Sequence, residues 1–326
     1  MIDFDKIVLY PGYSDIESRS EVNPYINIAS RGLKNKLPII VANMASLYSS
    51  DFIKFLNKNQ IITSVPRIGY NVTNELNNMP QDMWPFVSIS AKSEFYPFLD
   101  TLKDKKVHLL IDVNHGYHKN VMNTLQHIQD MKKDGAFQSS LLMVGNVSSI
   151  DGIVALFDWG ADIVKVGNSF GSACSTLIKT GFGVHGLHVC KQFYDSGLRD
   201  EYYLNKKYIC LDGGIRCIGD IAKALIYSDM VMIGKMFAGT TESGCEFVDD
   251  MKYKRYFGNA SYDAKVMDGK EKPEHVEGQA IFIPHTGSAL NLIQNIKEGL
   301  QSAFSFIGAR DLKEYQRNAG NYIEVL

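Results

Sequence analysis

Eight apolar runs of strand length, separated by amphipathic stretches, constrain the fold more than any other feature of the sequence. The runs are LPIIVAN (37–43), IITSV (61–65), FVSIS (86–90), VHLLIDV (107–113), LLMVGNV (141–147), DIVKVG (162–167), KYICLDGG (207–214) and MVMIG (230–234). The stretches between them, such as VMNTLQHIQDMKK, have apolar residues at helical spacing. Strands that are apolar on both faces are typical of parallel sheets covered by helices. Eight such units predict a (β/α)8 TIM barrel, with a doubly wound open sheet as the alternative.

The sequence shows no linker, repeat or low-complexity tract, so we expect a single barrel domain over residues 1–326. The segment of about 235–285 interrupts the alternation of strands and helices. It is rich in Gly, Lys, Asp and Tyr and has few apolar runs, so it is expected to be irregular and functional. A helix of about 286–305 is expected to follow it.

Charge and cysteine usage narrow the class of protein. A net charge of −2 and a pI near 6.4 give no indication of binding to nucleic acid or to an anionic membrane. No apolar run reaches the ~18 residues that a membrane span needs, and the start MIDFDKIVLY is not typical of a signal peptide. The five cysteines form no CxxC pair, which favours a reducing, cytoplasmic setting.

The loop after the sixth run, about 167–183, is the longest between strands and is rich in Gly, Ser and Thr. Cys174 lies in its middle, outside any apolar period, at the rim where a barrel builds its active site. We therefore expect Cys174 to be accessible as a reactive thiolate. Cys190 and Cys210 lie in apolar surroundings and are expected to be small buried residues.

Two glycine sites follow the seventh and eighth runs, Asp212-Gly213-Gly214 and Gly234-Lys235. Each alone is equally well explained by a tight turn. Their joint position favours a phosphate site, because glycine lets backbone N–H groups approach the oxygens closely. Asp212 would then accept hydrogen bonds from a ribose diol. Together with Cys174 these residues predict a pocket for a nucleoside monophosphate.

Several ordered motifs resemble the inosine monophosphate dehydrogenase / guanosine monophosphate reductase superfamily. They are the Cys loop, DGGIRCIGDIAKAL, MVMIGKMFAGTTES, YFGNAS and HVEGQAIFIPHTGS, with ESRSEV, LPIIVANM, IDVNHG and GNV upstream. The resemblance runs from about Asp3 to Leu312. The reductase branch is favoured because the chain has no room for the inserted regulatory domain of the dehydrogenases. It also has no Arg-Tyr pair of their mobile flap between Ser261 and Glu277.

The resemblance implies a reaction in which GMP and NADPH give IMP, ammonia and NADP. Cys174 would attack C2 of guanine and form a covalent thioimidate. Thr176 and Glu277 match the pair that protonates the leaving amine. A homotetramer is also implied.

The substrate and cofactor contacts of the family fall on residues of this chain as well. Those implied for the nucleotide are Asn43, Met44, Ser172, Asp212, Gly213, Gly214, Gly234, Lys235, Tyr256 and Gly278. Those implied for the cofactor are Asp112, Gly116 and Arg67.

The chain departs from the family inside the Cys loop. Ser169 replaces a Gly, and Phe170 replaces a Pro. In the family this loop holds a potassium ion, for which Gly167, Gly171 and Cys174 are the matching positions. Both changes remove the backbone preference for that turn. We therefore expect weak or no dependence on K⁺, with the Ser169 hydroxyl bonding a loop carbonyl directly.

Further departures lie around the base and the phosphate, at Ala45, Asn259, Leu177 and Lys235. They leave three alternatives to ordinary GMP reduction open. The first is the same chemistry on a deoxy- or modified guanine nucleotide, and the second is IMP oxidation of the dehydrogenase type. The third is a nucleotide-binding paralogue without turnover, which retention of the nucleophile and both proton-transfer residues disfavours.

Overall fold

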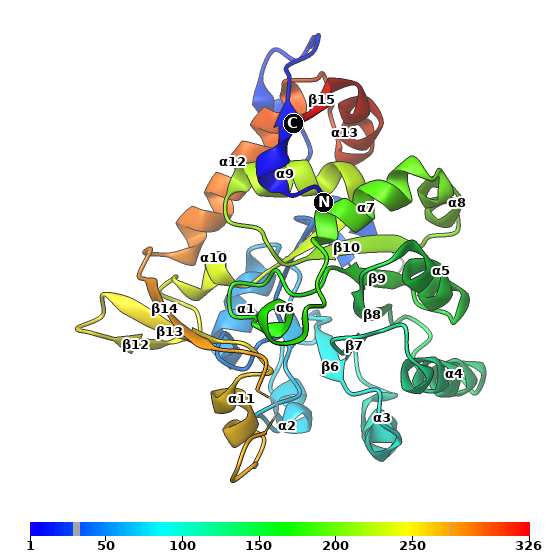
Figure 1. Ribbon diagram of the computed structural model, residues 1–326, viewed down its shortest axis with the longest axis vertical. Coiled ribbons are helices and arrows are strands. Elements are labelled where there is room, and N and C mark those ends of the chain that lie inside the picture. Colours follow the sequence, from blue (N-terminus) through cyan, green and yellow to red (C-terminus); the bar gives the residue numbers. More distant parts are fainter. Residues whose placement is uncertain (29–32, 275) are drawn as a thin grey trace.

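Eight parallel strands form the central sheet of the computed structural model, which describes residues 1–28, 33–274 and 276–326 (Figure 1). The strands are β4 (Ile39–Val41), β5 (Ser64–Val65), β6 (Phe86–Ile89), β7 (His108–Asp112), β8 (Leu142–Val147), β9 (Ile163–Val166), β10 (Tyr208–Asp212) and β11 (Met230–Ile233). Their order is β4-β11-β10-β9-β8-β7-β6-β5. A parallel bridge between Ile40 and Ile62 joins the two ends. The sheet therefore closes, which confirms the TIM barrel and excludes the open sheet.

Helices surround the barrel on its outer side (Figure 1). They are α1 (Ser50–Lys58), α2 (Val72–Asn77), α3 (Tyr96–Leu102), α4 (Lys119–Lys133), α5 (Ile150–Asp158), α7 (Gly186–Asp195), α8 (Leu198–Leu204), α9 (Ile218–Tyr227), α12 (Ala289–Ser305) and α13 (Leu312–Ala319). Serine caps begin several of them: Ser49 accepts from the N–H of Phe52, and Ser149 from that of Gly152. Strand residues such as Val164 and Leu211 are fully buried between the layers.

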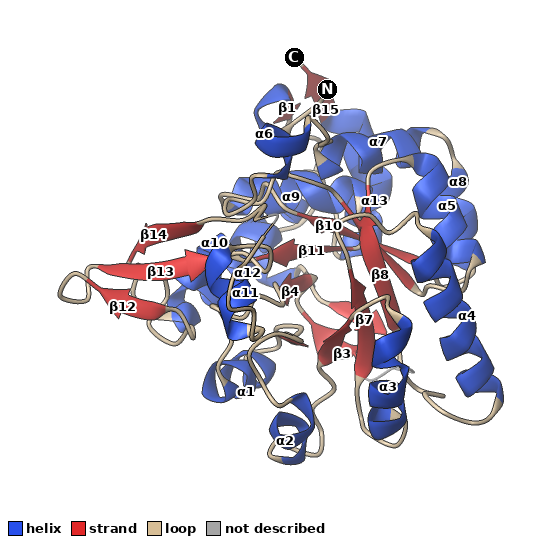
Figure 2. Cartoon of the chain, turned by 60° about the horizontal axis from the view of Figure 1, so that its bottom comes forward, coloured by secondary structure: helices blue, strands red, loops and turns tan. Residues whose placement is uncertain are grey.

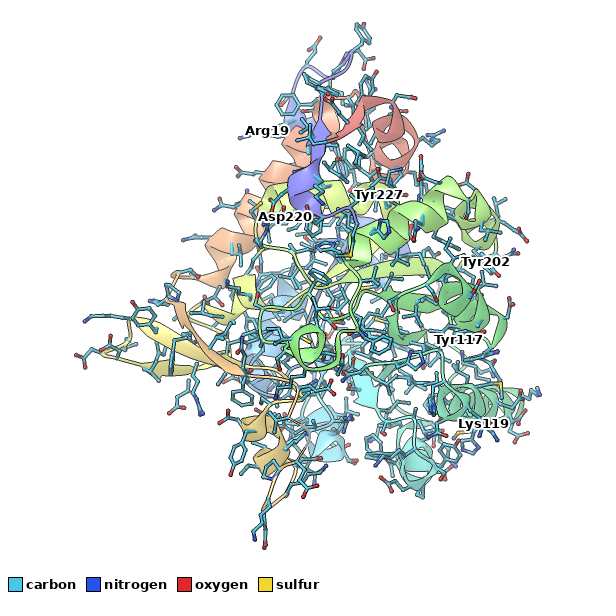
Figure 3. All side chains as sticks on the ribbon, in the orientation of Figure 1. Arg19, Tyr117, Lys119, Tyr202, Asp220 and Tyr227 are labelled. Carbon is cyan, nitrogen blue, oxygen red and sulfur yellow. The ribbon has the colours of Figure 1, made fainter. Side chains whose placement is uncertain are left out.

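The two ends of the chain meet on one side of the barrel (Figure 2). Strand β1 (Ile7–Leu9) pairs antiparallel with β15 (Ile323–Val325), and β2 (Ile26–Ile28) pairs with β3 (Leu33–Lys36). Short 3-10 turns η1 (Phe4–Lys6), η2 (Arg19–Glu21) and η5 (Gly320–Tyr322) lie beside these strands, and a fourth, η4 (Ser93–Phe95), precedes α3. Arg216 bridges Asp5 of η1 and Asp220 of α9, which fixes the N-terminal segment beside α9. Asp220 is labelled in Figure 3.

The segment 235–285 is more regular than its sequence predicts. It contains α10 (Lys235–Ala238), β12 (Glu246–Val248), β13 (Tyr253–Phe257), α11 (Tyr262–Met267) and β14 (Ala280–Pro284). The three strands form an antiparallel sheet that projects from the barrel (Figure 2). The expectation of an irregular segment was wrong because these strands expose part of each face and so lack long apolar runs.

Cysteine positions agree with the sequence analysis: Cys190 and Cys210 are buried, and Cys174 is partly exposed. No helix within the described part of the chain is long and apolar enough to cross a membrane.

Candidate active site

The candidate active site is a cavity of about 150 Å³ at the carboxyl ends of the barrel strands. Asn43 follows β4, Asp112 ends β7, Asn146 lies in β8 and Asp212 ends β10. Their side chains line the cavity together with the Cys loop. Figure 1 looks onto this end of the barrel, with the short helix α6 (Thr176–Thr180) of the Cys loop in front. Parallel strands bring all their carboxyl ends to one edge, so residues far apart in sequence converge here.

A buried lysine forms the floor of the cavity. Lys165 of β9 is only 3% exposed, and its Nζ lies 2.8 Å from Asp112 Oδ1 and 2.8 Å from Asp212 Oδ2. Asn146 Nδ2 donates to the same Asp212 oxygen at 2.9 Å. Asn43 Nδ2 donates to the other oxygen of Asp112, also at 2.9 Å. Two carboxylates and one ammonium leave one net negative charge at the ribose end predicted for the pocket.

Burial and charge act in opposite directions on this cluster. Burial by itself raises the pKa of Asp112, but the Lys165 ammonium and the hydrogen bonds from Lys165 and Asn43 outweigh it and hold that pKa below its usual range. Burial by itself lowers the pKa of Lys165, and the two carboxylates raise it above its ordinary value. Asp112 and Lys165 therefore stay charged at neutral pH.

Cys174, Thr176 and Glu277 form a hydrogen-bonded chain on one wall of the cavity. The Cys174 thiol donates to Thr176 Oγ1 at 3.3 Å, and Thr176 Oγ1 donates to Glu277 Oε2 at 2.9 Å. Asn114 Nδ2 also reaches Glu277 Oε2, at 3.4 Å. Thr176 is buried, whereas Cys174 is partly exposed toward the cavity. The arrangement can move a proton between the thiol and the carboxylate through the hydroxyl.

Backbone contacts hold the Cys loop against the segment that carries Glu277. The N–H of Ser175 donates to the Glu277 carbonyl at 2.8 Å, and the N–H of Gln279 donates to the Ala173 carbonyl at 3.0 Å. Gly278 lies between them, where a Cβ would be 2.7 Å from the Ser261 nitrogen. Only glycine fits this close approach. Backbone hydrogen bonds thus fix Cys174 and Glu277 relative to each other.

Asn259, next to the expected base position, is hydrogen-bonded to the loop that follows β4. Its Nδ2 donates to the Asn43 carbonyl at 3.0 Å, and its Oδ1 accepts from the Ala45 N–H at 3.4 Å. Ala45 and Asn259, two of the residues that differ from the family pattern, therefore contact each other. The Asn259 side chain still lines the cavity.

The glycine sites predicted for phosphate surround the other end. Gly213 has a positive φ of +88°, and its Cα lies close to the Gly171 nitrogen. A Cβ at this position would be only 3.2 Å from that nitrogen. Tyr256 lies so close to Gly234 that a Cβ there would be 2.2 Å from its Oη, and this hydroxyl donates to Met44 Sδ at 2.7 Å. Burial raises the pKa of Tyr256, so it remains a neutral hydroxyl. Gly213, Gly278 and Met44 line the cavity. The predicted residues outside its lining are Ser172, Gly214, Gly234, Lys235 and Tyr256, of which Ser172 and Lys235 are exposed.

A second cavity of about 440 Å³ adjoins the first and shares Asp112, Asn114 and Glu277 with it. Arg67, Lys92 and Lys265 add basic side chains to its wall. Of the residues predicted for the cofactor, Asp112 and Arg67 lie here. Gly116 does not line it; its N–H instead donates to the Asn146 carbonyl at 2.7 Å.

Sequence reasoning missed Lys165, Asn146 and Asn114. A signal was present for Lys165, because a charged residue in the run IVKV of a strand buried on both faces must be paired. Asn146 interrupts the run MVGNV in the same way. Within residues 1–28, 33–274 and 276–326, no group of three His, Cys, Asp or Glu side chains is arranged to hold a metal ion.

Fold and site together define a TIM barrel whose strand ends carry a cavity lined by a cysteine, with a hydroxyl–carboxylate pair beside it. Residues 82–325 match the family model of the IMP dehydrogenase / GMP reductase domain, which covers most of the chain. The chain therefore belongs to the IMP dehydrogenase / GMP reductase family and is an oxidoreductase.

Curated relatives support the same assignment. The chain is 34% identical to the GMP reductase of Staphylococcus aureus strain JH9 over 327 residues, which covers 96% of this chain and 93% of the relative. The GMP reductases of strains Newman and USA300 match with the same identity and coverage.

Proposed function

We propose that the protein catalyses the NADPH-dependent reductive deamination of a guanine nucleotide, GMP to IMP and ammonia. The observation that carries this proposal is the hydrogen-bonded chain Cys174–Thr176–Glu277 on the wall of the cavity at the carboxyl ends of the barrel strands. The relatives named GMP reductase support the same substrate.

In the first step the Cys174 sulfur bonds to C2 of guanine, and the bond from C2 to the exocyclic amine breaks. The thiol proton passes through the Thr176 hydroxyl to Glu277 and from there to the leaving nitrogen, which departs as ammonia. The product is a thioimidate between the Cys174 sulfur and the purine, and the thiol proton becomes the third hydrogen of ammonia. Thr176 donates to Glu277 already at 2.9 Å, so the path needs no large movement.

The second step needs a hydride at C2, which NADPH supplies when bound. The adjoining cavity would suit this cofactor, because Arg67, Lys92 and Lys265 on its wall would offer positive charge to the phosphates and Glu277 lines both cavities. The carbon–sulfur bond then breaks, IMP leaves, and the Cys174 thiolate takes up a proton. Asp212, held by Lys165 and Asn146, would accept hydrogen bonds from the ribose throughout.

A second candidate is the same chemistry on a deoxy- or modified guanine nucleotide. It is favoured by Asn259, whose amide is bonded to the Asn43 carbonyl and the Ala45 N–H where the resemblance places base contacts. Because the Asn43 carbonyl and the Ala45 N–H are hydrogen-bonded to the Asn259 amide, the protein offers the base other hydrogen-bonding groups than the family pattern implies.

A cytoplasmic homotetramer is part of the proposal. Large apolar side chains are exposed on the projecting sheet and on α11, which is typical of a surface that packs against another copy. They are Tyr253, Tyr262, Val266, Met267 and Phe282. Light scattering of the purified protein measures the number of subunits.

The experiment is to mix purified protein with NADPH and, one at a time, GMP, dGMP and base-modified guanine nucleotides. Loss of reduced-nicotinamide absorbance and release of ammonia are followed together. The proposal expects both signals with GMP in equal amounts, and the second candidate expects a higher kcat/KM for another member of the panel. Oxidation of IMP with NAD and no reaction in the reductive direction would contradict both.

A further inference from the structure

The Cys loop has two limbs, residues 167–170 where it begins and residues 182–185 where it ends. Ser169 and Phe170, which depart from the family pattern, connect these two limbs directly. Ser169 adopts φ of +72°, a left-handed conformation that residues with a Cβ rarely take. Its hydroxyl lies 2.9 Å from the Phe182 carbonyl on the opposite limb and 3.0 Å from Asn168 Oδ1. The Ser169 side chain therefore takes the glycine-like turn and adds a contact that glycine cannot make.

Neighbouring residues strengthen the same connection. Asn168 forms a bridge with Val184, its N–H donating to the Val184 carbonyl at 3.3 Å. The ring of Phe170 packs on His185 with 4.9 Å between ring centres, and His185 in turn contacts Phe4 at 5.0 Å. Three successive residues of the first limb thus contact the second limb or its end.

At two of the three positions implied for a potassium ion, Gly167 and Gly171, the loop carbonyl already accepts a hydrogen bond. Such a site needs several carbonyl oxygens directed at one point with lone pairs available for the ion. Here the Gly167 carbonyl accepts from Asn146 Nδ2 at 2.6 Å, and the Gly171 carbonyl accepts from the Cys174 N–H at 2.9 Å. The Phe182 carbonyl accepts from Ser169. Each of these donors places a positive hydrogen beside an oxygen that a cation would otherwise share.

We propose that Ser169 and Phe170 hold the Cys loop in its catalytic shape in place of a monovalent cation. Ser169 is then a positioning residue for Cys174, acting through the closed loop and not on the substrate. The inference rests on the proposed function only for its kinetic readout, because the shape of the loop also governs the chemical reactivity of the Cys174 thiol.

The test measures two quantities in potassium-, sodium- and lithium-only buffers of equal ionic strength. The first is the alkylation rate of Cys174 by iodoacetamide, followed on the Cys174 peptide by mass spectrometry and independent of any substrate. The second is kcat with GMP and NADPH. The proteins compared are the wild type, Ser169→Ala, Ser169→Gly and the control Ser49→Ala, which loses a helix-cap hydrogen bond far along the chain.

For the wild type and Ser49→Ala the expected alkylation rate and kcat are the same in all three salts. Ser169→Ala and Ser169→Gly are expected to change the alkylation rate several-fold and to lower kcat with little change in KM. Glycine accepts the positive φ without strain, so Ser169→Gly separates the lost hydroxyl from misfolding. A several-fold difference between K⁺ and Li⁺ in the wild-type alkylation rate or kcat, or variants identical to the wild type, would overturn the proposal. If GMP is not turned over, the proposed function is refuted. The alkylation rates would still decide whether Ser169 and Phe170 replace the cation.

Discussion

Thr176 Oγ1 donates a hydrogen bond to Glu277 Oε2 at 2.9 Å, although the two residues lie 101 positions apart in the sequence. The contact joins the Cys loop after β9 to the segment that leads into β14. Because Cys174 donates to the same Thr176 hydroxyl, the nucleophile and the carboxylate communicate through one oxygen atom. This chain of two hydrogen bonds is the geometry on which the proposed proton transfer depends.

Glu277→Gln is expected to lower kcat for the proposed reaction by about 10² or more, the usual contribution of a positioned acid–base group. The amide keeps the size of the side chain but cannot take the thiol proton or return it to the leaving amine. Steady-state kinetics and rapid measurement of ammonia release check this. The amine-loss step is expected to slow more than hydride transfer.

Substitutions at Thr176 provide the matched control. Thr176→Ser retains a hydroxyl at the same place and is expected to keep most of the activity, whereas Thr176→Val removes it at similar volume and is expected to behave like Glu277→Gln. Equal slowing of amine loss and hydride transfer in Glu277→Gln would mean that Glu277 binds the base and does not move protons.

Lys165→Met is expected to lower the free energy of unfolding by about 3 kcal/mol, since it leaves Asp112 and Asp212 facing each other without the buried ammonium. Denaturant unfolding measures the change. The control Lys191→Met breaks a more exposed ion pair with Asp195 and is expected to cost less than about 1 kcal/mol. Equal losses in the two variants would show that the buried cluster has no special role in stability.

His185 makes stability sensitive to acid. Burial lowers its pKa below the ordinary 6.5, and the neighbouring Arg216 acts in the same direction, while Asp3, Asp220 and Asp5 oppose them. The unfolded chain therefore binds a proton at His185 more readily than the folded chain. Stability from this residue is fully present above about pH 6.5 and is lost as pH falls from there to the lower folded pKa.

The measurement is Tm between about pH 8 and pH 5 for the wild type and His185→Asn. Asparagine retains an acceptor for the Leu187 N–H, which the His185 ring now bonds. The variant is expected to have a lower Tm at neutral pH, because Phe4 and Phe170 lose their ring contact, but a smaller fall toward acid. His188, whose pKa burial also lowers, is present in both proteins. Parallel Tm curves would refute the assignment to His185.

Sequence alone predicted the barrel because its strands are buried on both faces, which leaves a clear apolar signature in runs such as DIVKVG. It did not predict the sheet of β12–β14. Those strands pair with one another; β12 and β13 mix charged and apolar residues, and β14 alone of the three is a continuous apolar run, AIFIP (280–284).

The motifs named Cys174, Thr176 and Glu277, which the fold brings together, whereas Lys165 and Asn146 at the floor of the cavity were not predicted. The bond from Thr176 to Glu277 depends on a tertiary contact that only the fold supplies, and so does the position of Lys165 between two carboxylates. The hydrogen bonds of Asn259 to Asn43 and Ala45 likewise form only because the loop after β13 lies close to the loop after β4. Motifs indicate which side chains are present, and packing decides which of their atoms remain available to a ligand.

The covalent role of Cys174 is the central claim, and the mass of the intact protein tests it most directly. Wild-type protein and Cys174→Ala are each incubated with GMP without NADPH, quenched in acid and weighed by mass spectrometry. The account predicts that the wild type gains the mass of GMP less ammonia, that this addition lies on the Cys174 peptide and that NADPH removes it with release of IMP. It predicts no addition to Cys174→Ala, although that variant still binds the nucleotide. Turnover by Cys174→Ala at more than a small fraction of the wild-type rate would contradict the thioimidate route.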